Sequence, residues 1–399
     1  MKMGLMIPDF PGQTHVAMWR VGQAMRELGT EVQFFSTQRA DAQARCHDFL
    51  IEEATQTHYV YPPNPIAVFL TILRSPGGVW RCLQYIAGLK ESSLKDKIRC
   101  LFLLLCAADM AYYCQSQKIE HIFIHSCANA AHIGAMNFLL SGVTYSLRLG
   151  GDLEVYGSDH SSKMSKAAFV AAAAEPTRQQ VLDEVGLPPE KVYSVWLGVD
   201  TKRFVPPPQR ELTPGKIRLV TVARLNPAKG HSYAIEAVKQ LRDRDIDVHY
   251  TLIGSGESEA EIRQQIEKLE LSDCIHLIGA QGESKVIETL QASDVFVLPS
   301  INKGEASPVA ALEAMSCGLP AVCTIIGGTP NIVSDGVNGY LVPQKDAKSL
   351  AEGLYNLAQD VELRQKMSQA ARDRAIESFD CRLSAQRVLE AIKTHTDVS

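Results

Sequence analysis

The densest set of groups that could do chemistry lies in the segment PSINKGEASPVAALEAMSCGLP. Glu305 stands in a loop after a predicted strand, and Glu313 follows about two turns down a predicted helix with Pro308 in its first turn. Proline fits there because its missing N–H would have no intrahelical partner. The backbone N–H groups and the positive dipole end of such a helix start, here Ser307 to Val309, attract phosphate. The two carboxylates can each accept a pair of hydroxyl groups, which suits a sugar on one side and a ribose on the other.

Two cations follow another predicted strand. Arg224 and Lys229 stand five residues apart in the strand-to-helix turn VARLNPAKGH. Arginine can hold phosphate through two parallel hydrogen bonds and lysine as a point charge, so this pair can clamp a diphosphate. A lysine beside the positive end of a helix dipole also favours a bound anion there. The alternative interpretation is an exposed surface pair. Gly254, in a GSG turn after the next strand, lets the backbone turn tightly.

The elements that must position these groups alternate regularly in the second half of the chain. We predict strands at 217–223, 248–253, 275–278, 295–298, 321–324 and 339–342, and helices at 230–242, 257–269 and 283–292. Strands separated by helices of this length predict a parallel, doubly wound sheet. Ligands of such sheets bind at the carboxyl ends of the strands.

The first half opens with a βαβ unit that has a glycine turn after its first strand. We predict its strands at 2–8, 31–36, 121–125, 143–149 and 192–196. We predict one helix that ends at residue 28, an alanine-rich helix at 163–174 and a helix at 175–184. Residues 41–117 show apolar, helix-like stretches without clear boundaries. A proline-rich segment at 204–215 is the best linker. We therefore expect domains at 1–203 and 216–379.

The composition excludes several functional classes. The 399 residues, 46% hydrophobic, can bury two cores, and a net charge of −5 with scattered signs indicates no nucleic-acid surface. Ten cysteines without a CxxC pattern fit buried thiols in a reducing compartment. No stretch is apolar over the roughly 20 residues that a membrane span needs. We expect a cytoplasmic protein.

A basic excess between residues 60 and 118 leaves two interpretations open. Seven lysines and arginines stand there against three acidic residues, interleaved with apolar side chains. The segment could be a solvated amphipathic helix covering the sheet. It could also be a peripheral contact with the inner face of an anionic membrane.

From about residue 215 to 350, the sequence resembles the nucleotide-binding domain of retaining glycosyltransferases of family 4, which have the GT-B fold. The first half resembles them in layout and only patchily in residues. The matching parts are Arg224, Lys229, the GSG at Gly254, ASDVFVLPS, Glu305, Glu313, EAMSCGLPAV, Gly327-Gly328 and DGVNGYLV.

The resemblance implies an α/β protein with two Rossmann-like, doubly wound domains that face a central cleft, and a C-terminal helix within 380–399 that packs back on the first domain. It implies transfer of a sugar from a nucleotide diphosphate sugar, UDP-linked by family frequency, to a hydroxyl of an oligosaccharide or lipid-linked acceptor. No metal or other cofactor is expected.

The resemblance also implies roles for individual residues. Glu313 holds the ribose of the donor, Glu305 holds the hydroxyls of the transferred sugar, and Arg224 with Lys229 stabilises the leaving diphosphate, on which negative charge builds up. Gly12 approaches the same diphosphate. The further donor-binding residues are Gln13, Gly254, Ser307, Pro308 and Val309.

One departure from the family pattern matters. Many relatives carry a histidine in a segment like LHGDLEVYG, where this chain has Gly150 in LGGDLEVYG. His125, His15 and Asp152 are candidates for its replacement. Because of this departure, one alternative is a protein that binds a nucleotide sugar but has little or no catalytic activity. A phosphorylase or a sugar-nucleotide epimerase on the same architecture is the other alternative.

Overall fold

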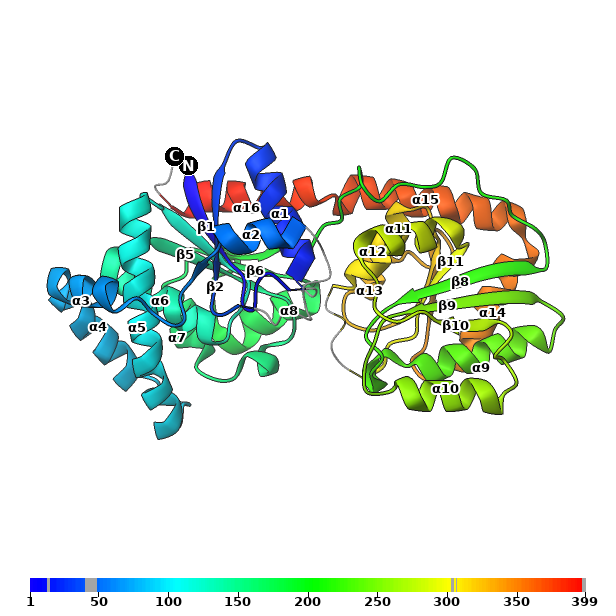
Figure 1. Ribbon diagram of the computed structural model, residues 1–399, viewed down its shortest axis with the longest axis horizontal. Coiled ribbons are helices and arrows are strands. Elements are labelled where there is room, and N and C mark those ends of the chain that lie inside the picture. The colour runs from blue at the N-terminus through cyan, green and yellow to red at the C-terminus, as the bar shows by residue number, and fades with distance from the viewer. Residues whose placement is uncertain (13–14, 40–48, 303–304, 306, 397–399) are drawn as a thin grey trace. The chain divides into compact units, whose positions relative to one another are not determined.

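The computed structural model describes residues 1–12, 15–39, 49–302, 305 and 307–396. It divides into two compact units, one of residues 1–197 with 382–399 and one of residues 198–381. Residues 204–215, predicted as a linker, lie in the second unit. Each unit is a parallel sheet with helices on both faces (Figure 1).

The first unit is built on a seven-stranded sheet in the order β3-β2-β1-β4-β5-β6-β7. Its strands are β1 (Lys2–Met6), β2 (Glu31–Ser36), β3 (His58–Tyr59), β4 (His121–Ile124), β5 (Thr144–Leu149), β6 (Val170–Ala172) and β7 (Val192–Ser194). Its helices are α1 (Val16–Glu27), α2 (Phe49–Gln56), α3 (Pro65–Arg74), α4 (Pro76–Ala87), α5 (Leu94–Gln117), α6 (Asn129–Ser141), α7 (His160–Met164) and α8 (Glu175–Gln180).

The second unit is built on a six-stranded sheet in the order β10-β9-β8-β11-β12-β13. Its strands are β8 (Lys216–Val222), β9 (Asp247–Ile253), β10 (Ile275–Leu277), β11 (Val295–Leu298), β12 (Ala321–Thr324) and β13 (Gly339–Val342). Its helices are α9 (His231–Arg242), α10 (Glu259–Lys268), α11 (Glu283–Ala292), α12 (Val309–Ser316), α13 (Thr329–Ile332), α14 (Ala347–Gln359) and α15 (Val361–Phe379). The last helix, α16 (Cys381–His395), belongs to the first unit from Arg382 onward.

Both strand orders reverse once, and the reversal fixes where a ligand fits. The chain moves outward in one direction from β1 or β8, then returns to the other side through β4 or β11. All the ladders that join these strands are parallel, for example Val295 with Leu219. The carboxyl ends of the two strands at a reversal are the usual ligand site of an open α/β sheet. The prediction of two doubly wound parallel sheets is confirmed.

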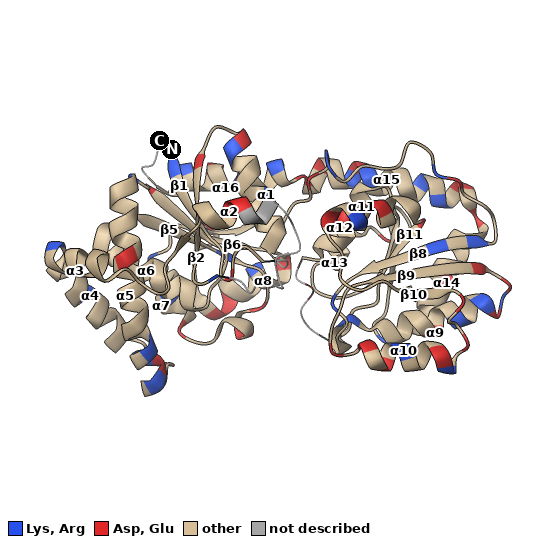
Figure 2. Cartoon of the chain, viewed as in Figure 1, with Lys and Arg blue, Asp and Glu red and all other residues tan. Residues whose placement is uncertain are grey.

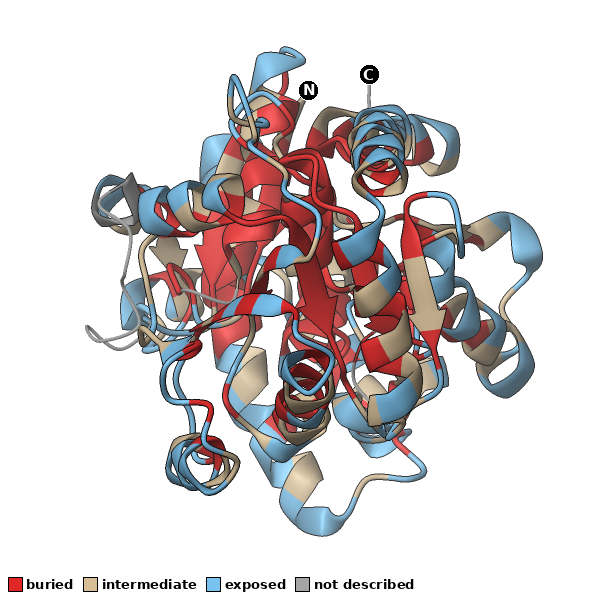
Figure 3. Ribbon diagram, turned by 90° about the vertical axis from the view of Figure 1, so that its right-hand side faces the viewer, coloured by how far each residue is buried: buried red, intermediate tan, exposed pale blue. Residues whose placement is uncertain are grey.

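The cores form because helices with one apolar stripe cover the inner strands, and β4, β11 and β12 are buried along their whole length (Figure 3). On α9, Ala234, Ile235, Val238 and Leu241 are buried, and this spacing places them on one side of the helix. They join a cluster of buried side chains from β8, β9 and β11. The helix thereby fixes the carboxyl end of β8, from which the predicted cations follow.

The alanine-rich segment 163–174 is not a helix, so that prediction is wrong. Its middle forms the short strand β6, which pairs with β5 on one side and β7 on the other. Val170, Ala171 and Ala172 are fully buried. Small side chains let α8 and its neighbours pack close to a central strand, and this packing outweighs the intrinsic helix propensity of alanine.

Three helices between β3 and β4 fill the region whose boundaries the sequence left open. Among the described residues, α5 is long and apolar enough to cross a membrane by length and composition, and 44% of its most apolar window is buried in the protein. The helices α3 and α4 pass the same test together, although the chain bends by 100° between them. α5 packs against both α3 and α6.

Candidate functional site

The carboxyl edge of the second sheet brings together the residues predicted to bind the diphosphate and the sugar. Arg224 follows β8, Gly254 follows β9, and the loop that contains Glu305 follows β11. β8 and β11 are adjacent and are the two strands at the reversal of strand order. The sequence-predicted cations and this carboxylate therefore lie at the expected ligand position of the sheet.

Lys229 and Glu305 contact each other directly. The Lys229 ammonium donates a hydrogen bond to Glu305 Oε1, and the Ser300 hydroxyl donates to the same oxygen over 2.8 Å. Glu305 is only 6% exposed. A carboxylate that is so far from water needs such partners to offset its lost hydration. This pairing was not predicted, because the two side chains were expected to contact different parts of one ligand.

The backbone around Glu305 is also held. The Gly328 N–H donates to the Glu305 carbonyl over 2.9 Å. This N–H is therefore engaged within the protein. The Thr329 hydroxyl closes the same turn by donating to the Thr324 carbonyl over 2.7 Å.

The helix start after Glu305 has the expected form, shifted by one residue. Pro308 is the N-cap and Val309 is the first residue of α12. The Ser307 hydroxyl is buried and has no hydrogen-bond partner in the part of the chain that the structure describes. A buried hydroxyl without a partner is unfavourable by about 1–3 kcal/mol, so this group is suited to a ligand. Glu313 lies in the second turn of α12 and is half-buried.

Gly254 is required by its surroundings. Its φ is +151°, and a Cβ at this position would lie 1.8 Å from the Ala223 carbonyl oxygen. The neighbouring Ser255 carbonyl accepts a hydrogen bond from the Leu225 N–H over 2.9 Å. The turn thus packs directly on the end of β8, just before Arg224. The tight backbone turn expected here is confirmed, and its contact with a donor stays a prediction.

One residue that supports the site was not predicted from the sequence. His231, the first residue of α9, is buried, and its Nε2 donates to the Arg224 carbonyl over 3.0 Å. Burial lowers the pKa of its imidazole, so the ring is neutral at pH 7. His231 therefore fixes the backbone that carries Arg224. A histidine next to Gly230 gave no signal of this contact in the sequence.

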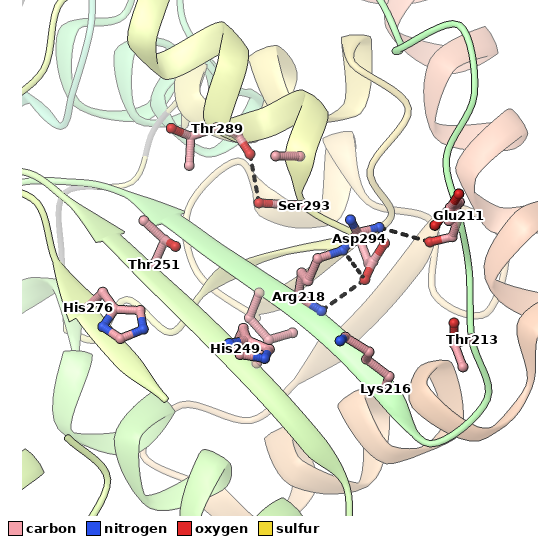
Figure 4. Close-up of a pocket in the computed structure, with 12 residues that line it drawn as sticks. Glu211, Thr213, Lys216, Arg218, His249, Thr251, His276, Thr289, Ser293 and Asp294 are labelled. Atoms are coloured by element: carbon pink, nitrogen blue, oxygen red, sulfur yellow. Dashed lines mark hydrogen bonds and ion pairs between the residues drawn. The ribbon is translucent and has the colours of Figure 1, made fainter. Parts of the chain in front are cut away.

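A cavity of about 450 Å³ in the same unit lies elsewhere (Figure 4). It is lined by β8, β9, β10 and the end of α11, and none of the predicted site residues contributes to it. The one guanidinium in its lining, that of Arg218, is bound by Asp294 through Nη2–Oδ1 at 2.7 Å and Nε–Oδ2 at 3.0 Å. Its charge is matched, so the cavity has no unpaired arginine for an anion.

In the first unit, the polar groups nearest Gly150 form a cluster. A Cβ at position 150 would lie 3.4 Å from His125 Cε1 and 3.6 Å from both Arg148 Nη1 and the Tyr156 hydroxyl. The Gly150 N–H donates to that hydroxyl over 2.7 Å. The His15 ring lies edge-on to His125 with the ring centroids 5.7 Å apart. Of the proposed replacements for the missing histidine, His125 is the one beside position 150.

The charges of this cluster are unusual for a buried site. Arg148 is 1% exposed, and its Nη2 has no partner among the described residues. Burial lowers the pKa of its guanidinium to about 10. Arg148 Nη1 donates to His125 Nδ1 over 3.2 Å. Burial, with this cation beside it, lowers the pKa of His125 well below its usual value. The neutral imidazole therefore carries its proton on Nε2.

The remaining predicted residues of the first unit are placed as follows. Gly12 is buried after the end of β1, and its carbonyl accepts from the His15 N–H over 3.2 Å. Gln13 lies outside the described residues. Within the described residues, no group of three or more His, Cys, Asp or Glu side chains could hold a metal ion.

A cavity of about 390 Å³ opens at the carboxyl edge of the first sheet. Its polar lining comes from the residues that follow β1, β2 and β4, and its apolar lining comes in part from α5. The lining includes Asp9, Ser126, Asn129, Tyr61, Leu103 and Cys106. The mixture suits a ligand with both hydroxyl groups and an apolar part.

Comparisons with known proteins agree with the geometry. Residues 207–374 match the family described as Glycosyl transferases group 1. The chain is 37% identical over 183 residues to the putative colanic acid biosynthesis glycosyltransferase WcaL of Escherichia coli, and 35% identical over 185 residues to the amylovoran biosynthesis glycosyltransferase AmsK of Erwinia amylovora. Both matches cover 45% of this chain and 45% of the relative. The chain thus spans about half the length of these curated relatives.

A solved structure extends the comparison over the whole chain. HepE of Anabaena, in complex with UDP-glucose, has a TM-score of 0.73 and 18% sequence identity, and the match covers 99% of this chain and 100% of HepE. At this identity the likeness shows the fold alone. The chain has the GT-B fold, and its residues 207–374 are similar to the group 1 glycosyl transferases.

Proposed function

We propose that this protein is a retaining glycosyltransferase of family 4. It moves a sugar from a nucleotide diphosphate sugar, with UDP as the expected nucleotide, to a hydroxyl of a saccharide acceptor in surface polysaccharide or glycolipid synthesis. The observation that carries the proposal is the contact of Lys229 with the buried carboxylate of Glu305 at the strand reversal of the group 1 domain. The polysaccharide assignment is supported by the names of the relatives, which act in colanic acid and amylovoran biosynthesis.

The proposed roles follow from the charges. When the bond between sugar and phosphate breaks, negative charge develops on the diphosphate, and a fixed cation stabilises it. Lys229 is positioned for this by Glu305, and an ammonium has three protons, so it can contact the carboxylate and a phosphate oxygen together. Arg224 supplies a second cation from the loop that His231 holds. The Ser307 hydroxyl and the first turn of α12 are further donors to the phosphate.

Glu305 and Glu313 keep the separate roles expected of them. Glu305, whose Oε1 is already hydrogen bonded, is proposed to accept hydroxyls of the transferred sugar through its other oxygen, and Glu313 to hold the ribose. In the first unit, His125 is proposed to donate its Nε2 proton to a sugar hydroxyl in place of the histidine that relatives carry at position 150. Gly12 and Gln13 are proposed donor contacts.

The acceptor is proposed to bind in the cavity of the first unit. Asp9, Ser126 and Asn129 can hydrogen bond to sugar hydroxyls, and Tyr61 offers a ring face to a sugar. The mixed lining supports either an oligosaccharide or a lipid-linked sugar. We propose that the protein acts at the inner face of a membrane, without a metal ion or other cofactor.

The donor half of the proposal can be tested without knowing the acceptor. UDP and a panel of UDP- and GDP-sugars should raise the melting temperature of the wild-type protein, since a ligand at 100 times its Kd adds about 2.7 kcal/mol of stability. Lys229→Ala should lose the shift. No shift with any member of the panel would contradict a nucleotide-sugar site.

Activity then separates the transferase from its alternatives. Transfer should need an acceptor, persist in EDTA, and give a product whose anomeric configuration by NMR is that of the donor. A requirement for inorganic phosphate would indicate a phosphorylase. Conversion of the donor into another sugar nucleotide without an acceptor would indicate an epimerase. Gly150 supports a second candidate, a donor-binding protein without turnover, which predicts a thermal shift with neither hydrolysis nor transfer.

A further inference from the structure

The helices α3, α4 and α5 present an apolar surface to solvent. Among the described residues, eight large apolar side chains are exposed by 60% or more, and six of them lie on these three helices. We call this set the α3–α5 surface: Ile66, Phe69, Leu73, Trp80, Leu94 and Phe102. A soluble protein normally turns the polar face of its outer helices to water, so an apolar face of this size marks an interaction site.

α5 shows the anomaly most clearly. Its inner side is buried, with Cys100, Ala107 and Met110 in the core of the first unit. Its outer side carries Leu94, Ile98, Leu101, Phe102 and Leu105, which are all exposed and follow one helical stripe. A helix that is apolar on both sides is unfavourable when one side stays exposed to water. An apolar partner would remove this outer stripe from water.

The charges around the surface identify its partner. Arg74, Arg81, Lys90 and Lys95 are all exposed, although the chain as a whole carries a charge of −5. Lysine and arginine are drawn in blue at the start of α5 in Figure 2.

The acidic groups of the same region are already engaged. Asp109 is buried and pairs with His58 at 3.2 Å. Asp96 caps α5 through Ser93 and binds Arg99 at 2.8 Å. Glu91 accepts a hydrogen bond from the Asp159 N–H over 2.7 Å. The side chains left to meet a partner are therefore apolar and positive.

We propose that the α3–α5 surface docks on a phospholipid bilayer with anionic headgroups, with its apolar side chains among the upper acyl chains and its cations at the phosphates. A second copy of this chain is a poorer partner, because a symmetric contact would bring the cations of the two copies together. α5 lies on the bilayer and does not cross it, since one side of the helix is bound to α3 and α6 and contains the buried Asp109.

The surface adjoins the proposed acceptor cavity. Leu103 and Cys106 of α5 line that cavity, while their neighbours Phe102 and Leu105 face outward. One helix therefore serves as the cavity wall and as the membrane contact. Resting on the proposed function, this arrangement makes the acceptor class a sugar anchored in the same bilayer.

The test uses flotation of the full-length protein with vesicles, without any donor. Wild type should float with vesicles of phosphatidylcholine containing 30% phosphatidylglycerol and bind more weakly to phosphatidylcholine alone. Phe69→Ser/Leu73→Ser/Phe102→Ser should weaken binding by about 100-fold or more, since each buried apolar group contributes to interfacial affinity. The matched control, Val155→Ser/Val337→Ser/Ile376→Ser, changes exposed apolar side chains elsewhere and should bind as wild type.

The charge component has its own variant. Lys90→Gln/Lys95→Gln should weaken binding to the anionic vesicles by about 30-fold, since each cation near the surface contributes about a fivefold factor. Lys268→Gln/Lys348→Gln makes the same charge change on exposed residues of the second unit and should have no effect.

The depth to which α4 enters the bilayer can be measured by tryptophan fluorescence. The chain has three tryptophans, and Trp80 is 62% exposed on α4, whereas Trp19 and Trp196 are half-buried. Lipids brominated on the acyl chains should quench wild type, and Trp80→Phe should abolish the quenching. Vesicle binding that survives both surface variants, no binding at all, or a wild-type dimer in ultracentrifugation that the serine variant dissociates would overturn the proposal. Because no donor is present, none of these results depends on glycosyl transfer: a failed donor test with intact vesicle binding would refute the proposed function alone.

Discussion

Replacing Lys229 by methionine should destabilise the second unit, because the buried Glu305 carboxylate then loses its ammonium partner. Removing one partner of a fully buried ion pair costs about 3–5 kcal/mol. The Lys229 side chain is 18% exposed, and Ser300 still donates to the carboxylate. We therefore expect a smaller loss, about 2 kcal/mol.

For a unit of this size, such a loss lowers the melting temperature by about 4–8 °C. The assay is thermal unfolding of wild type, Lys229→Met, Glu305→Gln and the double variant, each with and without UDP. The double variant removes the carboxylate charge along with its partner and should regain most of the lost stability. It should still bind UDP as weakly as Lys229→Met, because the ammonium proposed to hold the diphosphate is absent in both.

Two results would refute this reasoning. A double variant that is no more stable than Lys229→Met would show that an uncompensated carboxylate is not the cause of the loss. Recovery of UDP binding in the double variant would show that Lys229 acts on the donor only by neutralising Glu305.

Three further predictions address the frame of the site, the first-unit cluster and pH. Gly254→Ala should lower the free energy of unfolding by about 3 kcal/mol, because the new Cβ meets the Ala223 carbonyl. The control Gly215→Ala, at φ +72° with nothing within 4 Å of the new Cβ, should lower it by only about 1–2 kcal/mol. Equal losses of stability in urea unfolding would contradict the clash. His125→Gln should reduce turnover by about 100-fold and leave the UDP thermal shift unchanged, and unchanged turnover would exclude His125 as the replacement histidine. Burial lowers the pKa of His121 to about 3 from 6.5, so as the pH falls the unfolded chain binds a proton before the folded protein does. The free energy of unfolding, which has its full value above pH 6.5, should therefore fall by about 2 kcal/mol between pH 6.5 and 5. His121→Gln should flatten this fall, and parallel curves of stability against pH for the two proteins would contradict the prediction.

The second sheet was predictable because its strands are short buried runs between turn residues. The predicted strand 295–298 and helix 283–292 occur with the same bounds, and the runs end at Gly, Pro or Ser, which stop regular structure for local reasons. The prediction of a helix at 163–174 was wrong because alanine is both the best helix former and a side chain small enough for a crowded inner strand. Only the pairing with β5 and β7, far apart in sequence, decides between the two.

The candidate site was predictable in its groups but not in their contacts. Residue type and position after a strand placed Arg224, Lys229 and Glu305 at one edge of the sheet. Lys229 and Glu305 are 76 residues apart, and their contact depends on β11 returning to the side of β8. Strand order is a property of the folded sheet, so no local pattern could reveal that contact. The same holds for His231, whose partner is a backbone carbonyl that carries no sequence signal.

The double role proposed for α5 has a kinetic consequence. An enzyme held on a bilayer by Phe102 and its neighbours, with Leu103 lining the cavity behind them, meets a lipid-anchored acceptor by diffusion in two dimensions. Both partners are then confined to a thin layer, where their effective concentration far exceeds the bulk value. The rate should follow the surface density of the acceptor in the membrane, and diluting the vesicles with inert lipid should slow the reaction even when the total acceptor concentration is constant.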